Sequence, residues 1–414
     1  MTEKKKKILL KNTIMLYILT FSNYFFNFIT VPYQTRILGP EIYGKLGFAM
    51  AFITYFQLVL DFGFILSATE DISKNRDSNI QMSKILTAVN ICKIILSIIL
   101  CVILIMCCTF IQIFREDILL FFLYFVYVVV NSLLPDFLYR GIEDMKIITY
   151  RSVGIKLLFT VLIFIFLKDK SQYYLVPVFN IIGSTLAVVA VYIHVIRKLN
   201  VKMVKVPFAF VRDTFRRSST FFFSRIATTV YSSTNTFILG FVYPTGNTLG
   251  LYSTSDKLIL TAKNAVTPIS DSIYPYMVKN KDFKLIKKIL LCIMPIIIIG
   301  CIIVGIFACP LCSILFGKEF YNTGIILRYM LPLVVLALPS YLLGFPSLSP
   351  LGLSKYANYT VIWGAILQII SIVILYLFKI INVYTICYAT IITEAFILLA
   401  RIVIILKRNK LIEQ

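Results

Sequence analysis

Charge is scarce in this sequence, and no long polar stretch interrupts it. Only 14% of the 414 residues are Asp, Glu, Lys or Arg, whereas 59% are hydrophobic. A soluble domain is typically near half apolar and about a quarter charged. Because no polar run is long enough to fold by itself, the composition excludes a soluble protein and also a membrane protein with a sizeable soluble domain.

Motifs of the common catalytic classes are missing as well. The chain contains one His and has no P-loop, no HExxH and no glycine-rich dinucleotide turn. A membrane polymerase or a lipid-linked glycosyltransferase needs a sizeable exposed catalytic loop, and every loop here is short. We therefore expect a chain that is not an enzyme and that needs no metal and no cofactor.

Cysteine, in contrast, is present nine times, always in or beside apolar runs. In such surroundings a thiol behaves as a small hydrophobe. Cys309 and Cys312 form a single CxxC near the end of a span. Since no second ligand pair accompanies it, packing is the preferred interpretation over a redox or metal site.

Apolar runs long enough to cross a bilayer recur from one end of the chain to the other. The runs are continuous rather than alternating, which indicates helices and not barrel strands. The sequence therefore predicts an all-α polytopic membrane protein with twelve transmembrane helices. Their approximate limits are 10–33, 46–68, 84–110, 118–139, 147–167, 173–196, 217–243, 250–277, 285–309, 324–346, 357–379 and 381–406.

Basic residues are distributed unevenly between the loops. The chain starts with MTEKKKKILLKN, and no small-residue cleavage site follows, so we expect an uncleaved first span. With this end in the cytoplasm, both termini are cytoplasmic, because the other side receives few basic residues. The net charge of +22 lies in short loops and not in a folded patch, so we expect no nucleic-acid partner. The outer basic residues are Arg36, Lys45, Arg115, Lys168, Lys170, Lys318, Arg328 and Lys379.

Two short echoes indicate an internal duplication. The sequence PEIYGKLGFA after the first span is echoed by GNTLGLYSTS after the seventh, which places Gly44 against Gly250. LYRGIEDMK and LSPLGLSKY repeat at a similar offset. We expect two six-helix lobes, residues 1–200 and 217–414, joined by a cytoplasmic linker at 201–216. Parallel repeats of this kind are typical of transporters with a central pathway.

The stretch RILGPEIYGKLG, which contains one Pro and three glycines, separates the first two spans. Gly and Pro permit a tight reversal without a strand or a domain. The sequence predicts a short outer loop here, with an architectural role at the ends of helices that part during transport.

Polar side chains follow one face of the first span and of its counterpart, the seventh. The candidates for a polar cavity lining are Asn23, Asn27, Thr30, Thr229 and Ser232. The alternative interpretation is polar contact between helices, which Ser, Thr and Asn routinely supply. Because the stripes occupy matched helices, with Arg225 among them, we favour a solvated pathway.

Four basic residues within spans are candidates for anion binding, namely Arg225, Lys263, Lys93 and Lys156. Arg225 lies about 13 Å beyond Arg216 along a helix, too far for snorkelling alone. Arg binds phosphate or carboxylate through two parallel hydrogen bonds, and Lys binds as a point charge. For Lys93 and Lys156, snorkelling to the cytoplasmic surface remains an equal alternative.

Two deep carboxylates, Asp61 and Glu394, are candidates for binding a coupling ion, H⁺ or Na⁺. Glu394 shares a helix face with Arg401, so a structural ion pair between them is the alternative. His194 lies near a predicted cytoplasmic helix end, where interfacial snorkelling is expected.

Five blocks of the sequence carry a family resemblance. They are TVPYQTRILGPEIYGKLGFAMAF, DFGFILSATEDISKNR, LPDFLYRGIEDMKIITYRSVGIKLL, LGLYSTSDKLILTAKNAVTPISDSIYPYM and LFGKEF. From about residue 10 to 400, the chain resembles polysaccharide biosynthesis membrane proteins. More narrowly, it resembles Wzx-type O-antigen and capsule repeat-unit flippases of the multidrug/oligosaccharidyl-lipid/polysaccharide exporter (MOP) superfamily, which also contains the MATE transporters.

The resemblance implies translocation of an undecaprenyl-pyrophosphate-linked oligosaccharide across the bacterial inner membrane by alternating access and ion antiport. It also implies a monomer among membrane lipids, with a glycan polymerase and a chain-length regulator as further partners. Roles transfer only to Asp61, Arg225 and Lys263, as lining residues. A lipid II flippase and a cation-coupled multidrug exporter are the rival functions, although an exporter of cations would favour a pathway rich in Asp and Glu.

Overall fold

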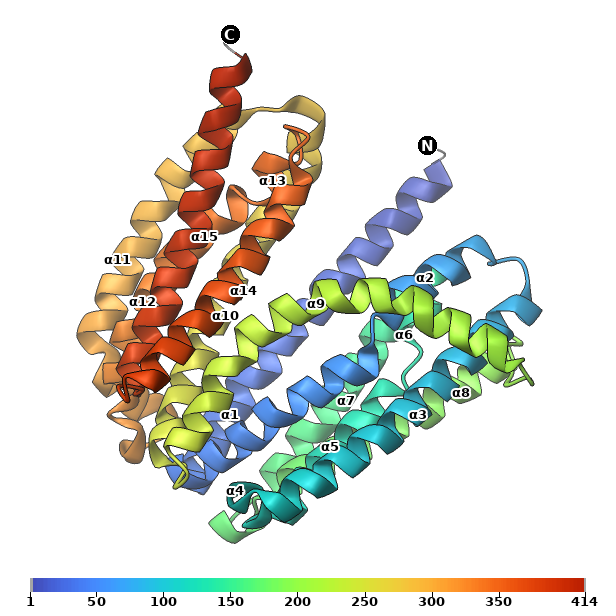
Figure 1. The fold of residues 1–414 in the computed structure, drawn as a ribbon, viewed down its shortest axis with the longest axis horizontal. Coiled ribbons are helices and arrows are strands. Elements are labelled where there is room, and N and C mark those ends of the chain that lie inside the picture. The colour runs from blue at the N-terminus through green and yellow to red at the C-terminus, as the bar shows by residue number, and fades with distance from the viewer. Residues whose placement is uncertain (1–2, 413–414) are drawn as a thin grey trace. The chain divides into compact units, whose positions relative to one another are not determined.

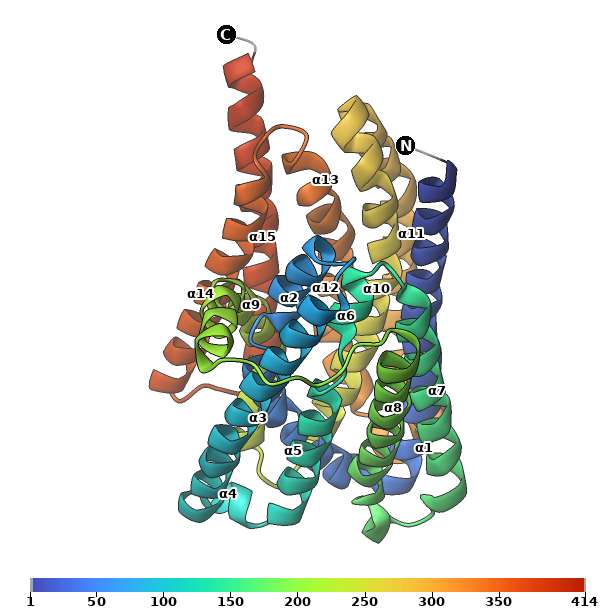
Figure 2. The same ribbon diagram turned by 90° about the vertical axis from the view of Figure 1, so that its right-hand side faces the viewer.

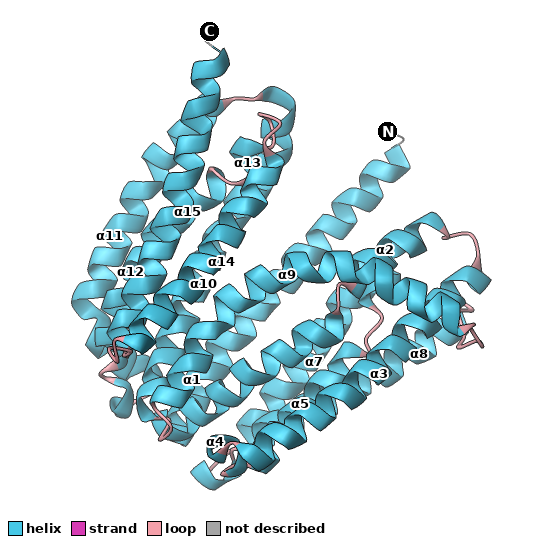
Figure 3. Ribbon diagram, in the orientation of Figure 1, coloured by secondary structure: helices cyan, strands magenta, loops and turns pink. Residues whose placement is uncertain are grey.

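The computed structural model describes the backbone of residues 3–412. Inside its helices, the side chains of residues 3–11, 13, 16, 223–225, 227–232, 275 and 408–412 lie outside this description. Within the described part of the chain every regular element is a helix, and Figure 3 shows no strand. The all-α prediction is confirmed.

Figures 1 and 2 label the helices, which have the following bounds. The long ones are α1 Glu3–Asp61, α3 Asn79–Phe110, α5 Ile118–Ser132, α7 Met145–Phe166, α8 Leu175–Lys198, α9 Phe208–Val242, α10 Asn247–Asn280, α11 Phe283–Phe316, α12 Thr323–Leu342, α14 Ser354–Leu377 and α15 Val383–Ile412. The shorter ones are α2 Phe64–Lys74, α4 Gln112–Arg115, α6 Asp136–Gly141 and α13 Phe345–Leu348, with 3₁₀ turns at Lys170–Gln172 and Lys318–Phe320.

Nine segments of the described residues are long and apolar enough to cross a membrane. All twelve windows from the sequence fall on helices, and the first two occupy a single segment, Tyr17–Lys74. Helices α9 and α10 are not among the nine segments. The most apolar window of α11 has a mean hydropathy of 3.2 and no buried residue, as expected for a side facing lipid. The count of twelve spans and the cytoplasmic termini stay predictions.

The stretch Arg36–Gly47 is helical, so the prediction of a loop was wrong. Only Gly39 departs from helical geometry, with φ of 70° and ψ of 170°, and it separates α1 into two arms (Figure 1). A positive φ is accessible to Gly at little cost because it has no Cβ. One glycine thus produces the change of direction for which the sequence predicted a loop.

The chain divides into two compact units. Unit 1 comprises Met1–Leu38 and Ala49–Thr229, and unit 2 comprises Gly39–Phe48 and Val230–Gln414. The predicted linker at 201–216 covers the connection before α9 and the first turns of that helix, while the units divide further along α9. The duplication itself stays a prediction.

Aromatic packing forms the centre of unit 1. Phe52 on the second arm of α1 lies 4.5 Å, centroid to centroid, from Phe114 on α4 and 5.9 Å from Phe121 on α5. All three side chains are buried. Such aromatic pairs each contribute about 0.5–1.5 kcal/mol beyond the area they bury. They hold the carboxyl-terminal arm of α1 against α5.

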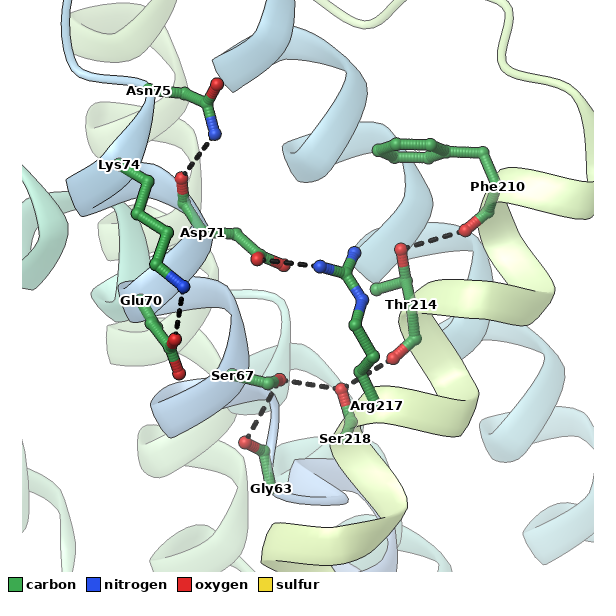
Figure 4. A network of polar contacts seen from close by, with 10 residues as sticks. All are labelled: Gly63, Ser67, Glu70, Asp71, Lys74, Asn75, Phe210, Thr214, Arg217 and Ser218. Carbon is green, nitrogen blue, oxygen red and sulfur yellow. Dashed lines mark hydrogen bonds and ion pairs between the residues drawn. The ribbon is translucent and has the colours of Figure 1, made fainter.

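Unit 1 also contains a polar network between α2 and α9 (Figure 4). The Arg217 Nη1 atom donates to Asp71 Oδ1 at 2.8 Å, and the hydroxyls of Ser67 and Ser218 lie 2.6 Å apart. Gly63, with a φ of 75°, is the N-cap residue immediately before α2. A Cβ on Gly63 would lie 2.7 Å from the Ser218 carbonyl oxygen. The close backbone approach and the two polar contacts join the first half of α9 to α2.

In unit 2, α12 packs against α10, α11 and α15. Its buried Ala337, Leu338 and Leu342 form a core with Val266 and Met277 of α10. Because α12 contacts three long helices, it is the central helix of this unit.

The bend of α1 belongs to unit 2, where it packs on the start of α10 through glycines. A Cβ on Gly44 would overlap the Gly246 carbonyl, and one on Gly250 would overlap the Pro40 carbonyl. Main chain thus touches main chain, and no side chain fits between. Gly44 and Gly250, which the sequence paired as counterparts in a repeat, lie in direct contact.

We expect Gly250→Ala to destabilise the protein, because the new methyl group would collide with backbone and not with a movable side chain. Overpacking of this kind costs about 1–3 kcal/mol. Gly300→Ala on α11 is the matched control, because a Cβ on Gly300 would meet nothing within 4 Å and Ala favours a helix by about 0.5–1 kcal/mol. Thermal unfolding of the purified proteins in detergent provides the measurement, and equal melting temperatures for both variants would contradict the packing.

Candidate functional site

Four of the six deep charges predicted from the sequence lie in two clusters, one in each unit: Lys263 with Glu394, and Lys93 with Asp61. In unit 2, Lys263 on α10 donates from Nζ to Oε1 of Glu394 on α15 at 2.5 Å. Their side chains are 16% and 9% exposed, so the pair is largely shielded from solvent. Asp256, seven residues earlier on α10, adds a second negative charge that acts on Lys263. The structure therefore joins a predicted anion-binding residue to a predicted coupling residue.

The alternative partner for Glu394, Arg401, makes different contacts. Its Nη1 donates to the backbone oxygen of Ser340 at 2.5 Å and to the Ser340 hydroxyl at 3.0 Å, and Nε donates to Thr360 at 3.2 Å. Arg401 thereby joins α15 to α12 and α14. The alternative interpretation, an ion pair between Glu394 and Arg401, does not hold, because Glu394 pairs with the Lys263 ammonium of α10; the coupling role of Glu394 stays a prediction.

A chain of amides and hydroxyls connects α9, α14 and α15 in the same unit. The Gln368 amide donates to Asn235 Oδ1 at 2.8 Å, and Asn235 Nδ2 donates to Thr390 Oγ1 at 2.9 Å. The Thr393 hydroxyl donates to Gln368 Oε1 at 2.8 Å. Sequence reasoning missed these residues as a group. The signal was the spacing of Thr390 and Glu394, which places both on one face of α15.

Unit 1 contains the second cluster, centred on Lys93 of α3. This side chain is buried, and its Nζ donates to the backbone oxygen of Ser132 at the end of α5. Nζ also lies 5.8 Å from the centroid of the Phe137 ring. The carboxylates of Asp61 and Asp136 supply the negative charge that acts on this ammonium. Lys93 is therefore held inside the unit and does not snorkel, and the charge of the predicted coupling residue Asp61 acts on it.

Sequence reasoning missed Asp136 and Arg151, which extend this cluster. The Arg151 Nη1 atom donates to Asp136 Oδ1, and Nη2 donates to Oδ2 at 3.1 Å. The Arg151 side chain is only 9% exposed. Both residues lie near helix ends, where a charged side chain ordinarily lies at the membrane interface. The sequence therefore offered no reason to expect them in a shielded ion pair. Asn90, one turn before Lys93, was a clearer signal, and it donates to the Tyr192 hydroxyl at 2.7 Å.

The polar side chains along one face of α1 lie in different environments. Thr30 is buried and donates to the Phe26 carbonyl of its own helix at 2.8 Å, Asn23 is half-buried and Asn27 is exposed. Lys156 on α7 is half-buried, and it forms no ion pair with any residue that the structure describes. The side chains of Arg225, Thr229 and Ser232 lie outside the described residues. The cavity lining therefore stays a prediction.

His194 is hydrogen-bonded within unit 1, and the two thiols of the CxxC are buried. His194 Nδ1 lies 3.0 Å from the Tyr139 hydroxyl, so this ring nitrogen is hydrogen-bonded inside unit 1. Cys309 and Cys312 are free thiols and are buried. No group of three metal-ligating side chains occurs in the part of the chain that the structure describes.

Breaking the ion pair of unit 2 on one side should be costly. Lys263→Met leaves the Glu394 carboxylate buried without its partner, and the loss of one member of a buried pair typically costs about 3–5 kcal/mol. Lys263→Met combined with Glu394→Gln removes both charges and should recover most of that loss. Melting temperatures of the single and double variants in detergent test the pair. A double variant less stable than the single one would contradict it.

The amino-acid sequence is similar to a known family and to two named proteins. Residues 9–281 match the family described as polysaccharide biosynthesis protein. A protein of Shigella dysenteriae named "Putative O-antigen transporter" is 28% identical over 87% of this chain and 91% of its own length. A protein of Escherichia coli (strain K12) with the same name is 29% identical over 79% of this chain and 80% of its own length.

Solved structures resemble the fold over almost all of the chain. An inward-facing MATE family transporter of the MOP superfamily has a TM-score of 0.67 at 14% identity, covering 94% of each chain. The lipid II flippase MurJ, inward closed, has a TM-score of 0.64 at 14% identity, covering 95% of this chain and 86% of its own. The MATE-like fold is confirmed, and none of these names describes an enzyme. Since the matched residues span well over half of its length, the chain belongs to the polysaccharide biosynthesis protein family of membrane proteins.

Proposed function

We propose that the protein is a flippase for undecaprenyl-pyrophosphate-linked oligosaccharide repeat units, which it moves from the cytoplasmic to the outer leaflet of the cell membrane. The product would serve O-antigen or capsule synthesis. The family, the two relatives named as O-antigen transporters and the MurJ-like fold support this assignment. We also propose that transport proceeds by alternating access with ion antiport.

The observation that carries the proposal is the ion pair of Lys263 and Glu394. A pyrophosphate competes for the Lys263 ammonium with the carboxylate that already holds it at 2.5 Å. The Lys263 ammonium binds a substrate anion with its full affinity only when the Glu394 carboxylate is neutralised or has moved away. The ionisation of Glu394 therefore controls the affinity for an anionic substrate, which is what a coupled transporter of a phosphate-bearing lipid requires.

Replacing both members of the pair should separate transport from stability. Lys263→Gln with Glu394→Gln removes both charges of the pair together, so neither is left without its partner and we expect normal protein abundance. Charge-assisted hydrogen bonds contribute about 1.5–3 kcal/mol, so surface glycan should fall roughly tenfold to a hundredfold. The measurement is surface glycan in cells that make the native lipid-linked repeat unit.

The matched control for this experiment is the exposed pair Lys74 and Glu70, whose side chains are 66% and 54% exposed. The same double change to Gln at these positions should leave surface glycan at the native level. Native glycan from the Lys263 and Glu394 double variant would refute the role of the pair. Transport of lipid II or export of cationic drugs by the unaltered chain, without glycan transport, would refute the proposed substrate.

Asp61 is the proposed site of ion coupling. Asp61→Asn keeps the shape of the side chain but removes its ionisable group, next to the buried Lys93. We expect this variant to transport slowly and to lose any acceleration by an imposed proton gradient. Reconstituted vesicles with and without the gradient provide the measurement, and Asp77→Asn, in an exposed position, is the control. Unchanged acceleration in Asp61→Asn would exclude this residue.

A further inference from the structure

A groove runs between α7 and α8 of unit 1, two helices that pack side by side (Figure 2). Its volume is about 380 Å³, which falls in the range of small-molecule sites. The wall consists of side chains from these two helices alone. Leu186 and Tyr150, which line it, are 56% and 57% exposed, so the groove opens to the surroundings of the helix pair. Both helices are long and apolar enough to cross a membrane, and only 22% and 39% of their most apolar windows is buried, so we infer that the groove faces lipid.

The polar atoms of the groove are concentrated at one end. Arg151, in the second turn of α7, and His194, in the last turns of α8, both line it. Arg151 Nε is buried and has no hydrogen-bond partner among the described residues. The Lys146 ammonium lies 5.3 Å from the ring centroid of Tyr150, which also lines this end. Since Asp136 already pairs with Arg151, Lys146 is the cation that this end offers to a ligand, on the side that the basic loops predict to be cytoplasmic.

Small residues keep the rest of the groove open. Gly154, Gly183, Ala187 and Ala190 line it, interspersed with Leu and Ile. A Cβ on Gly154 would meet nothing within 4 Å, whereas one on Gly183 would lie 3.0 Å from Ile155 Cγ2. The space beside Gly154 is thus unfilled, whereas Ile155 occupies the space beside Gly183.

We propose that this groove binds the part of the lipid carrier's polyprenyl chain that lies nearest the phosphate, with the phosphate at the end that carries Lys146. An apolar channel with one cationic end complements a hydrocarbon with a phosphate at its head. A polyprenyl chain has a methyl branch in every isoprene unit, and the open space beside Gly154 accommodates such a branch, which a straight acyl chain does not have. The identity of the carrier rests on the proposed function.

A binding site for the polyprenyl chain on the lipid-facing surface also agrees with the free-energy requirements of transport. Only the glycan and the pyrophosphate need to leave water and cross the hydrocarbon region. The polyprenyl chain is already in an apolar medium, and moving it through a polar pathway would be unfavourable. The groove would hold the carrier at the predicted cytoplasmic side, where the lipid-linked repeat unit is loaded.

The test uses purified full-length protein in detergent and radiolabelled undecaprenyl phosphate. Gly154→Leu fills the open space beside Gly154, where a Cβ would meet nothing within 4 Å, and Leu suits a helix better than Gly. We expect this variant to bind undecaprenyl phosphate about tenfold more weakly than the native chain, a difference that equilibrium binding resolves easily. Gly300→Leu is the matched control, because Gly300 is equally open but lies on α11. It should bind as the native chain does.

Two further arms identify the ligand. Dioleoylphosphatidylglycerol in excess should fail to displace the label, and Lys146→Gln should weaken binding of undecaprenyl phosphate but not of undecaprenol. Native binding by Gly154→Leu would overturn the proposal, and so would full displacement by the phospholipid, which would make the groove a general acyl-chain site. Transport by the unaltered chain tests the proposed function separately, since these binding measurements require no translocation.

Discussion

The fold of unit 2 depends on a contact in which two helices meet through glycine. Where Gly44 faces Gly246 and Gly250, the backbone of α1 approaches the start of α10 so closely that no Cβ fits. The Lys257 ammonium reinforces the contact by donating to the Tyr43 hydroxyl at 2.5 Å. In lipid, apolar side chains gain little from leaving their solvent, so helix association relies on close packing and on polar contacts of this kind. The contact explains why ten residues of α1, Gly39–Phe48, belong to a different unit from both arms of the same helix.

The same physics requires every buried charge to have a partner. An isolated ion in a medium of low dielectric is strongly disfavoured, and pairing with hydrogen bonding compensates for its desolvation. Lys263 has Glu394, Arg151 has Asp136, and Lys93 has a backbone carbonyl with two carboxylates nearby. Hydroxyls and carbonyls of neighbouring helices serve Arg401 in the same way. In the transport that we propose, a phosphate entering such a site would replace an existing partner, and its binding would then depend on the charge state of the carboxylates.

The helices could be predicted from the sequence, whereas their contacts could not. Hydrophobicity depends on each segment alone, and every predicted window falls on a helix. The depth of Lys263 and Glu394 was also predictable, because each interrupts a long apolar run, whereas snorkelling remained an equal alternative for Lys93. The pairing of Lys263 with Glu394 was not, since these residues lie 131 positions apart and meet only through the packing of α10 and α15. Local spacing suggested Arg401 instead. Composition likewise suggested a loop around Gly39, because sequence does not reveal that one residue with positive φ suffices to bend a helix.

Two kinds of surface in this protein match the two halves of one amphiphilic molecule. The paired charges of Lys263 and Glu394 are shielded inside unit 2, as suits a binding group for pyrophosphate that must exclude competing water. The groove of α7 and α8 opens outward from unit 1, where Leu186 and Tyr150 are more than half exposed. The substrate of a cationic-drug carrier has no phosphate for the Lys263 ammonium to bind and no long chain for the groove to hold. Both features therefore agree with the lipid-linked anionic substrate that we propose from the family and its relatives.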